Sequence, residues 1–334
     1  GGALVVRYAR TVEVGGKIFH RVCAQAIDVH GGMQNRAATD RPFTRILIHH
    51  NKAVDTLLNV DDFGGIETWQ GGPAYVYNNI SGNPGGYRNW DHVLSPDTED
   101  RFGHAYYLDG AFKNYYFNNI AWGRSKGPSG RLANTSAFQQ IISFQNTIFN
   151  NTLYNFVRGS RRQAPQAGRV KFLGNIWQSM GLRVFRDADP AKTETAGHEA
   201  HARTDGSRFA IDTNAYARNV FYGVGESFGV LEPSGRWHGT LTSFRSALQS
   251  YRPLAASVGV IAEQSPLRDP GAFDFRPTSE SAARALGAKV FVPWGLYETV
   301  AEWHFTPLPG EPQRIIDEHW CMSPYYTRRD DYHK

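Results

Sequence analysis

The chain has very little cysteine and no long apolar run. Its 334 residues include two cysteines, Cys23 and Cys321, which lie near opposite ends. Their number and spacing match neither a disulfide framework nor a metal site, so we expect two plain thiols, with a bridge between them as the alternative. No apolar stretch approaches the roughly 18–20 residues that cross a bilayer, which excludes a helical membrane protein.

Short motifs of several functional classes are also missing. There is no phosphate-cradling glycine loop, nucleophile elbow or nucleic-acid motif, so we expect neither a nucleotide cofactor nor a nucleic-acid partner. The run His198-Glu199-Ala200-His201 is one residue short of the zinc-protease motif. We therefore expect no metal site, although calcium bound by loop carboxylates would need no short motif. The net charge of +5 is spread along the chain and favours an anionic partner only weakly.

The chain is instead rich in turn-forming and aromatic residues, and it contains an internal repeat. It has 34 glycines, eight tryptophans and sixteen tyrosines. A short strand-like phrase ending in asparagine recurs at 75–80, 115–120 and 147–152, with weaker copies at 171–176 and 215–220 and a relative at 46–51. The copies are separated by roughly 25 to 40 residues, a period that indicates a solenoid with insertions between its units.

The repeated phrase predicts a parallel β-helix. Its β-branched and aromatic residues favour strands. Asparagine tolerates the left-handed backbone of a sharp corner, and its amide can pair with the equivalent asparagine one coil away. A second phrase with glycines, at 26–32, 65–72 and 104–111, precedes the first, so each coil is predicted to contain a strand, a glycine corner, a second strand and an asparagine corner. The segments lack the stripes of a helical solenoid and the hairpin signals of a propeller.

Two stretches resemble a known superfamily. Gly65-Ile66-Glu67-Thr68-Trp69 and Tyr107-Leu108-Asp109-Gly110 are similar to the "GIYTW … YLDDG" pattern of right-handed parallel β-helix proteins of the pectate-lyase-like superfamily, with glycoside hydrolases of family 141 as enzymatic relatives. A helix expected at about 242–251, followed by Asp274-Phe275-Arg276-Pro277, resembles the closing coils of bacterial β-helix proteins. One departure is that the doubled aspartate of the pattern is here Asp109 followed by Gly110.

The resemblance implies an all-β, right-handed β-helix over about 1–296 and a carbohydrate-active protein that is secreted, to the periplasm or beyond. The N-terminal cap of such proteins does not show in the sequence, and the first six residues form no signal peptide, so the chain is either a mature product or a piece of a longer one. Residues 297–334, rich in proline, tryptophan and arginine, are expected to form an irregular tail or a linker.

Carboxylates near the glycine corners are the candidate catalytic groups. Glycoside hydrolysis commonly uses two carboxylates, and in a β-helix these can come from adjacent coils about 4.8 Å apart. Glu67 and Asp109 occupy related phrases, Asp62 lies just upstream, and His104 could orient a carboxylate or a hydroxyl. The register stays open: aligning the isoleucines stacks Asp28 with Glu67, whereas aligning the glycines stacks His30, Gln70 and Asp109. The alternative role for these acids is to cap turns.

Candidate substrate-binding residues lie in these coils, in the insertions at 81–102 and 121–135, and in the basic run 158–162. Aromatic side chains can stack on sugar rings, and arginine can bind carboxylate or sulfate in bidentate fashion. The candidates are Trp69, Tyr87, Arg88, Trp90, Tyr107, Trp122, Arg124 and Arg161. A solvated loop is the alternative interpretation of the basic run.

Three functions are compatible with these features. The first is a glycoside hydrolase acting on an acidic or sulfated polysaccharide. The second is a polysaccharide lyase, which needs a base beside a uronate and a cation that neutralises its carboxylate. The third is a non-catalytic β-helix that binds carbohydrate or serves a structural role, in which the acids would point in different directions.

Overall fold

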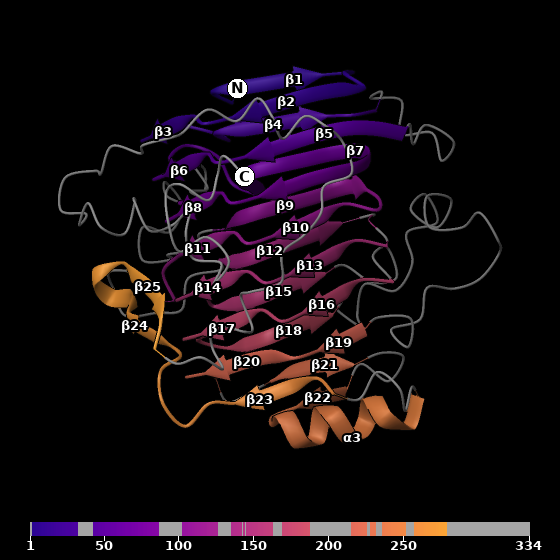
Figure 1. Cartoon of the computed structure of the whole chain (residues 1–334), viewed down its shortest axis with the longest axis vertical. Coiled ribbons are helices and arrows are strands. Elements are labelled where there is room, and N and C mark those ends of the chain that lie inside the picture. Colours follow the sequence, from indigo (N-terminus) through magenta and orange to yellow (C-terminus); the bar gives the residue numbers. More distant parts are fainter. Residues whose placement is uncertain are drawn as a thin grey trace, which may run out of the picture.

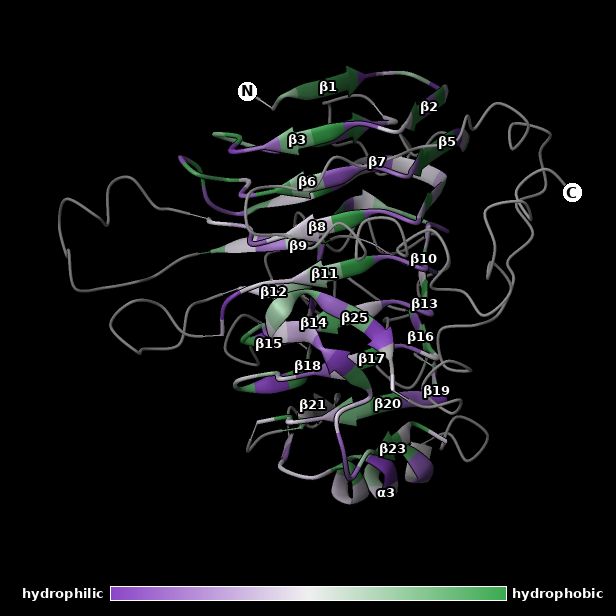
Figure 2. Ribbon diagram, turned by 60° about the vertical axis from the view of Figure 1, so that its left-hand side comes forward, coloured by the Kyte–Doolittle hydropathy of each residue, from purple (hydrophilic) through white to green (hydrophobic). Residues whose placement is uncertain are grey.

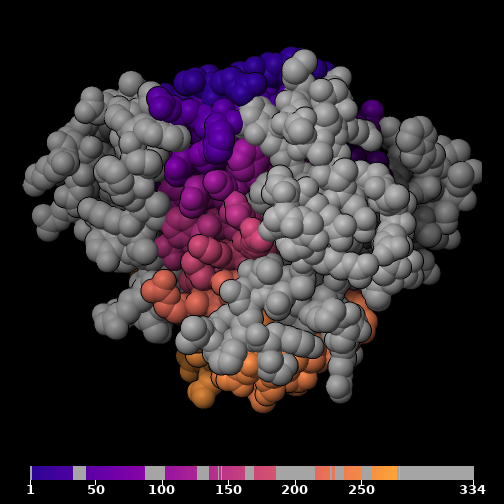
Figure 3. Space-filling model, turned by 90° about the vertical axis from the view of Figure 1, so that its right-hand side faces the viewer, coloured from indigo at the N-terminus to yellow at the C-terminus, as the bar shows by residue number. Residues whose placement is uncertain are grey.

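The chain forms a parallel β-solenoid in a computed structural model (Figure 1). The structure describes residues 2–32, 43–86, 102–125, 135–141, 143, 145–162, 169–187, 215–225, 228–231, 236–251 and 257–278. Successive coils stack in sequence order, so the described residues change from indigo at one end of the molecule to orange at the other (Figure 3). The predicted all-β parallel solenoid is confirmed.

Three sheets make up the walls. Sheet A contains β1 (Leu4–Arg7), β4 (Ile27–His30), the first part of β7 (Phe63–Tyr77), β9 (Gly103–Ala111), β12 (Ser136–Ile141), β15 (Arg158–Arg162), β18 (Arg183–Asp187), β21 (Gly229–Leu231) and the antiparallel β22 (Arg236–His238). Sheet B contains β2 (Thr11–Gly15), β5 (Phe43–His49), the second part of β7, β10 (Tyr115–Phe117), β13 (Thr147–Phe149), β16 (Lys171–Leu173) and β19 (Ala215–Ala217). Sheet C contains β3 (Ile18–His20), β6 (Lys52–Val54), β8 (Ile80–Gly82), β11 (Ile120–Trp122), β14 (Thr152–Tyr154), β17 (Ile176–Gln178), β20 (Asn219–Tyr222) and β23 (Gly259–Ile261).

Each complete coil therefore has three strands, whereas the sequence predicted two. The strand that was missed follows the asparagine corner and belongs to sheet C. Most sheet C strands are three residues long, and several of their inward positions hold small residues such as Ala53, Ser81 and Ala121. Such a segment is too short and too weakly apolar to show strand periodicity.

The two adjacent asparagines of the repeated phrase have different roles. The first adopts the left-handed conformation, as at Asn78 with φ 52° and Asn118 with φ 53°. The second is buried and belongs to a ladder in which each Nδ2 donates to the Oδ1 of the next asparagine at 2.9–3.1 Å. The ladder residues are Asn51, Asn79, Asn119, Asn151, Asn175 and Asn219. Both predicted functions of asparagine are thus present, on separate residues.

Apolar side chains fill the solenoid and α3 closes one end. Alternate residues of the strands, such as Ile66, Val76 and Tyr116, point inward and form one core cluster. The helix predicted at 242–251 is present as α3 (Leu241–Tyr251), and its Phe244 packs on Phe185 with ring centroids 5.8 Å apart. The helix lies at the end of the solenoid opposite β1 (Figure 1). None of the described helices is long and apolar enough to cross a membrane.

The last described strands form a hairpin beside sheet C. It consists of β24 (Leu267–Asp269), the 3₁₀ turn η4 (Pro270–Ala272) and β25 (Asp274–Pro277). Figure 2 shows β25 in front of the sheet C strands β14 and β17. The predicted tail at 297–334 lies outside the described residues. Cys23 is exposed and carries a free thiol, while Cys321 falls outside the described part of the chain.

Candidate functional site

The outward face of sheet A carries a continuous row of polar side chains. Because Ile27 and Ile66 are paired and belong to the core, alternation turns Asp28 and its register partner Glu67 outward. The same register position continues through three further coils as Tyr107, Gln139 and Arg161. Of the two registers that the sequence left open, the alignment on isoleucines is the correct one. The alignment on glycines is wrong, because Trp69 rather than Gln70 lies between His30 and Asp109.

Glu67 lies at the centre of a group of carboxylates. Its side chain is largely buried, and burial raises its pKa well above the ordinary range. The negative charges of Asp28, Asp109 and Asp62 raise the pKa further, while a hydrogen bond from the backbone N–H of Gly64 opposes the shift. Glu67 therefore holds a proton at a pH where an exposed glutamate has lost it.

Tyr107 separates the carboxylates from the basic side chains of the face. Its hydroxyl donates to Oδ1 of Asp62 at 3.4 Å. Burial raises the pKa of Tyr107 well above its usual range, and the charges of Asp109, Asp62 and Glu67 act in the same direction. Tyr107 thus keeps its proton and serves as a hydrogen-bond donor beside the acids.

His104 lies three residues before Tyr107 in β9, and the two rings meet edge to face with centroids 5.6 Å apart. Ser136 and Arg158 occupy its register position in the next two coils. His104 is fully buried, its Nδ1 is 2.5 Å from Oγ of Ser136, and its Nε2 makes no hydrogen bond with any described residue. Burial lowers the pKa of His104 well below its ordinary value, and the positive charges of Arg161 and Arg158 lower it further. The ring is therefore neutral, and its buried Nε2 is left without a hydrogen-bond partner among the described residues.

Gln139 continues the row of polar side chains. It is fully buried between its register partners Tyr107 and Arg161, and neither end of its carboxamide is hydrogen-bonded within the described structure. A buried amide without partners is costly, so such a group commonly marks a position that water or a ligand occupies.

A histidine–aspartate pair borders the face on the side of the first coils. His30 Nε2 lies 2.7 Å from Oδ2 of Asp28, and the edge of the His30 ring contacts Trp69 with a centroid distance of 4.3 Å. The other oxygen of Asp28 and Nδ1 of His30 have no hydrogen-bond partner among the described residues. Trp69 is half-buried, so part of the indole remains exposed.

Most of the predicted site residues fall on this one face. The structure brings together Glu67, Asp109, Asp62, His104, Trp69, Tyr107 and Arg161. Trp122 and Arg124 lie elsewhere, at the sheet C side of the solenoid. The indole of Trp122 packs between Gly82 and Phe275, so little of it is exposed. Tyr87, Arg88 and Trp90 lie outside the described residues.

Ser136 and Gln139 were not among the predicted site residues. The run Ser136-Ala137-Phe138 occupies the register of His104-Ala105-Tyr106 one coil earlier. This pattern of a polar residue, an alanine and an inward aromatic residue could have aligned the two coils across the long insertion between them. The alignment would have placed Gln139 beside Tyr107.

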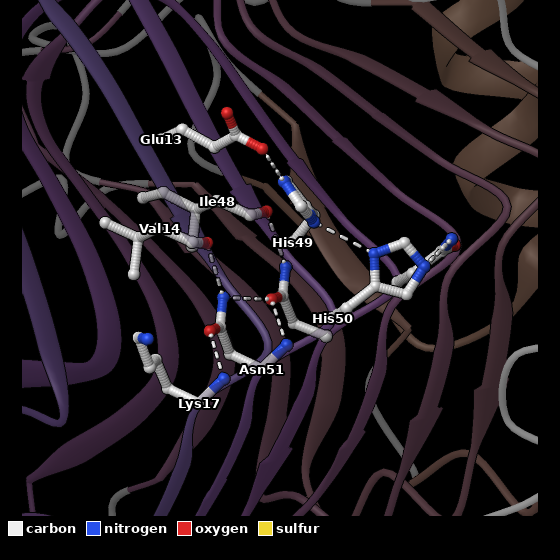
Figure 4. Close-up of polar contacts among 9 residues, drawn as sticks. Glu13, Val14, Lys17, Ile48, His49, His50 and Asn51 are labelled. Carbon is white, nitrogen blue, oxygen red and sulfur yellow. Dashed lines mark hydrogen bonds and ion pairs between the residues drawn. The ribbon is translucent and has the colours of Figure 1, made fainter. Parts of the chain in front are cut away.

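The pair His49-His50 forms a separate polar chain on sheet B (Figure 4). Nε2 of His49 is 3.1 Å from Oε1 of Glu13, and its Nδ1 is 2.9 Å from Nδ1 of His50. The pKa of His49 is lowered by burial, against an opposing contribution from Glu13. A neutral His49 that donates to Glu13 and accepts from His50 satisfies all these contacts. Both histidines are buried, and His50 turns at the corner with φ 53°.

No group of three or more potential ligands among the described residues could hold a metal ion. Comparison with known proteins identifies no relative: no family model matches the chain, and no curated protein or solved structure shows a significant match. The chemistry of the site therefore has to be inferred from its own geometry.

Proposed function

We propose that this protein is a glycoside hydrolase acting on an acidic polysaccharide and that the outward face of sheet A is its active site. The observation that carries the proposal is the burial of Glu67 among other carboxylates. Burial raises the pKa of this carboxyl group, as the proton donor of glycosidic cleavage requires. Asp109 is the partner carboxylate, which activates water or attacks the sugar directly. Asp62 and Tyr107 form a hydrogen-bonded pair that borders these groups.

The basic part of the same face supports an anionic substrate. Arg158 and Arg161 follow the acids along the solenoid, and Arg183 is the register partner of Arg158 in the next coil. Successive coils lie about 4.8 Å apart, which puts Arg161 about 14 Å from Glu67 along the axis. An extended polymer lying along the face would thus meet arginines that bind carboxylate or sulfate at one end and the reactive carboxyl groups at the other.

The family assignment and the location belong to this proposal. The solenoid and the "GIETW" and "YLDG" runs support a member of the pectate-lyase-like superfamily, with glycoside hydrolases of family 141 as the enzymatic model. A polysaccharide substrate implies a secreted protein, in the periplasm or outside the cell.

One observation favours a lyase as the second candidate. Neutral His104 has an Nε2 without a hydrogen-bond partner among the described residues, and the charges of Arg158 and Arg161 act on it. A base beside arginines is the arrangement that removes a proton next to a uronate carboxylate and neutralises that carboxylate. In this case His104 replaces Glu67 as the group that exchanges a proton with the substrate.

The test is to incubate the full chain with a panel of acidic and neutral polysaccharides and to follow new reducing ends together with the ultraviolet absorbance of unsaturated products. For a hydrolase we expect reducing ends without absorbance, and a loss of about 10²–10⁴-fold in kcat for Glu67→Gln. Glu263→Gln, which changes an exposed glutamate outside the face, is the matched control and should keep full activity.

Other outcomes discriminate among the candidates. Absorbance that is lost in His104→Ala and kept in Glu67→Gln would replace the hydrolase by the lyase. Activity that survives in both variants would remove the outward face of sheet A as the active site. No product from any polymer of the panel would contradict catalysis and leave a non-catalytic solenoid.

A further inference from the structure

A second site lies on a different wall of the solenoid. A cavity of ≈ 600 Å³ opens between the corner that follows sheet C and the β24–β25 hairpin. Small-ligand sites commonly enclose about 300–1,000 Å³, so the cavity has the volume of a ligand site. The outward face of sheet A, with Glu67 and Arg161, does not contribute to its lining.

The polar wall of the cavity is built by the coil corners. Arg21, Asp55, Asn83 and Asn155 each follow a sheet C strand, and each adopts the left-handed conformation with φ between 50° and 60°. Backbone hydrogen bonds connect these corners, for example from the N–H of Asp55 to the carbonyl of Gly82. Corner side chains of successive coils are therefore held in a column by the backbone, a rigid arrangement suited to binding.

The opposite wall comes from the hairpin. Phe273 and Pro270 line the cavity, and Phe275 of the same hairpin stacks on Trp122 with ring centroids 5.5 Å apart. Tyr154 is half-buried and lines the cavity. The site thus combines apolar ring surface with carboxamide side chains, which is the combination that recognises a sugar ring and its hydroxyl groups.

The charges of the lining select an anion. Arg21 and Arg124 are exposed, and their guanidinium groups make no ion pair within the described part of the chain. Among the described residues that line the cavity, Asp55 alone has a carboxylate, and its oxygens already interact with His20 and with Nδ2 of Asn83. Asp269 lies nearby, and its Oδ1 caps the turn of the hairpin by accepting from the N–H of Ala272. Two arginines, on corners three coils apart, are therefore each available to a carboxylate.

We propose that this cavity is a non-catalytic binding site for a carboxylate-bearing saccharide. Arg21 and Arg124 lie at corners three coils, or about 14 Å, apart, so each binds the carboxylate of a different sugar unit. Hydroxyl groups are bound by Asn83 and by the second N–H of Asn155, whose first N–H donates to the carbonyl of Gly123, and the apolar ring face is bound by Tyr154. Such a site would hold a chain of an acidic polymer on the side of the protein while another segment occupies sheet A. The lining of the cavity alone supports this site, whichever reaction the outward face of sheet A performs.

The experiment measures binding without turnover. Isothermal titration of the full chain carrying Glu67→Gln is carried out with short oligomers of galacturonate, of mannuronate and of glucuronate, and with the methyl ester of each oligomer that binds. We expect at least one oligouronide to bind, and its methyl ester to bind at least about tenfold more weakly, because charge-assisted hydrogen bonds are the stronger kind.

Variants assign the binding to one of the two faces. Adding Arg21→Gln together with Arg124→Gln should weaken binding about tenfold or more, whereas Arg10→Gln, an exposed arginine outside the cavity, should leave it unchanged. The proposal would be overturned if Arg161→Gln abolished binding while the Arg21 and Arg124 substitutions had no effect. It would also be overturned if none of the oligouronides bound, or if a methyl ester bound as tightly as its free acid. Circular dichroism of each variant confirms folding. None of these results depends on catalysis, so they stand whether or not the hydrolase assay succeeds.

Discussion

The asparagine ladder allows a direct test of what holds the coils together. Asn119 lies in its middle, and the change to examine is Asn119→Ala. The Oδ1 atom of Asn119 accepts from the backbone N–H and from Nδ2 of Asn79, at 3.0 and 3.1 Å. Its Nδ2 donates to the carbonyl of Val76 and to Oδ1 of Asn151, both at 2.9 Å. The substitution thus removes four hydrogen bonds from a buried site.

The size of the effect follows from these contacts. A net contribution of about 1 kcal/mol for each hydrogen bond gives a loss of about 4 kcal/mol in the free energy of unfolding. The matched control is the neighbouring residue, in Asn118→Gly. Asn118 contributes a left-handed backbone with φ 53°, and its Oδ1 has no hydrogen-bond partner among the described residues. Because glycine adopts that conformation without strain, we expect a change of less than about 1 kcal/mol.

Urea denaturation followed by circular dichroism measures both variants. The comparison requires equal slopes of the free energy against urea, so that a shift of the midpoint reports stability rather than a change in the surface exposed. If Asn119→Ala cost less than 1 kcal/mol, or if the two variants lost the same amount, the assignment of separate roles to the two asparagines would be refuted.

Three further predictions concern other parts of the chain. Glu67→Gln should raise the melting temperature near neutral pH, because the raised pKa of Glu67 in the folded state makes its ionisation destabilising. The gain in melting temperature should shrink as the pH falls toward the ordinary glutamate pKa, and a gain independent of pH would contradict this. Glu13→Gln should lower the pKa of His49, which NMR titration of the ring measures, since Glu13 opposes the effect of burial; an unchanged or higher pKa would argue against the contact. Gly72→Ala should lower the free energy of unfolding by about 1–3 kcal/mol in urea denaturation, because the Cβ of the new alanine would overlap the carbonyl oxygen of Phe112. An unchanged midpoint would show that the backbone shifts at this position without a loss of stability.

The solenoid could be predicted from the sequence because its corners have a distinct chemistry. The asparagine pairs, as at Asn118 and Asn119, mark the turn from sheet B to sheet C in several coils, and the strand before them is apolar on alternate residues. Sheet C could not be predicted, because strands such as Ile80–Gly82 have three residues and are held by the corners on either side rather than by their own pattern.

The candidate site could be predicted only in part. Pairing of the isoleucine phrases correctly places Asp28 beside Glu67, since residues at one register position share a face. The contribution of Gln139 depends on alignment across an insertion, and the neutral state of His104 depends on burial and on arginines two coils away. Burial is a property of the assembled coils and has no local signal in the sequence.

The ladder also has a direction, and this limits how such a protein can gain or lose coils during evolution. Every bond between side-chain amides runs toward the C-terminal coils, while the second N–H of each amide donates to a backbone carbonyl of the preceding coil. Backbone groups complete both ends, where Lys17 N–H donates to Asn51 and Asn219 donates to the carbonyl of Val258. A duplicated coil would be accepted in the middle of the stack if it carried its own asparagine, since each asparagine meets the same partners on either side. A duplication that began or ended inside a coil would leave a rung without its neighbour. Growth by whole coils, with insertions confined to the loops between strands, is therefore the route that preserves the ladder.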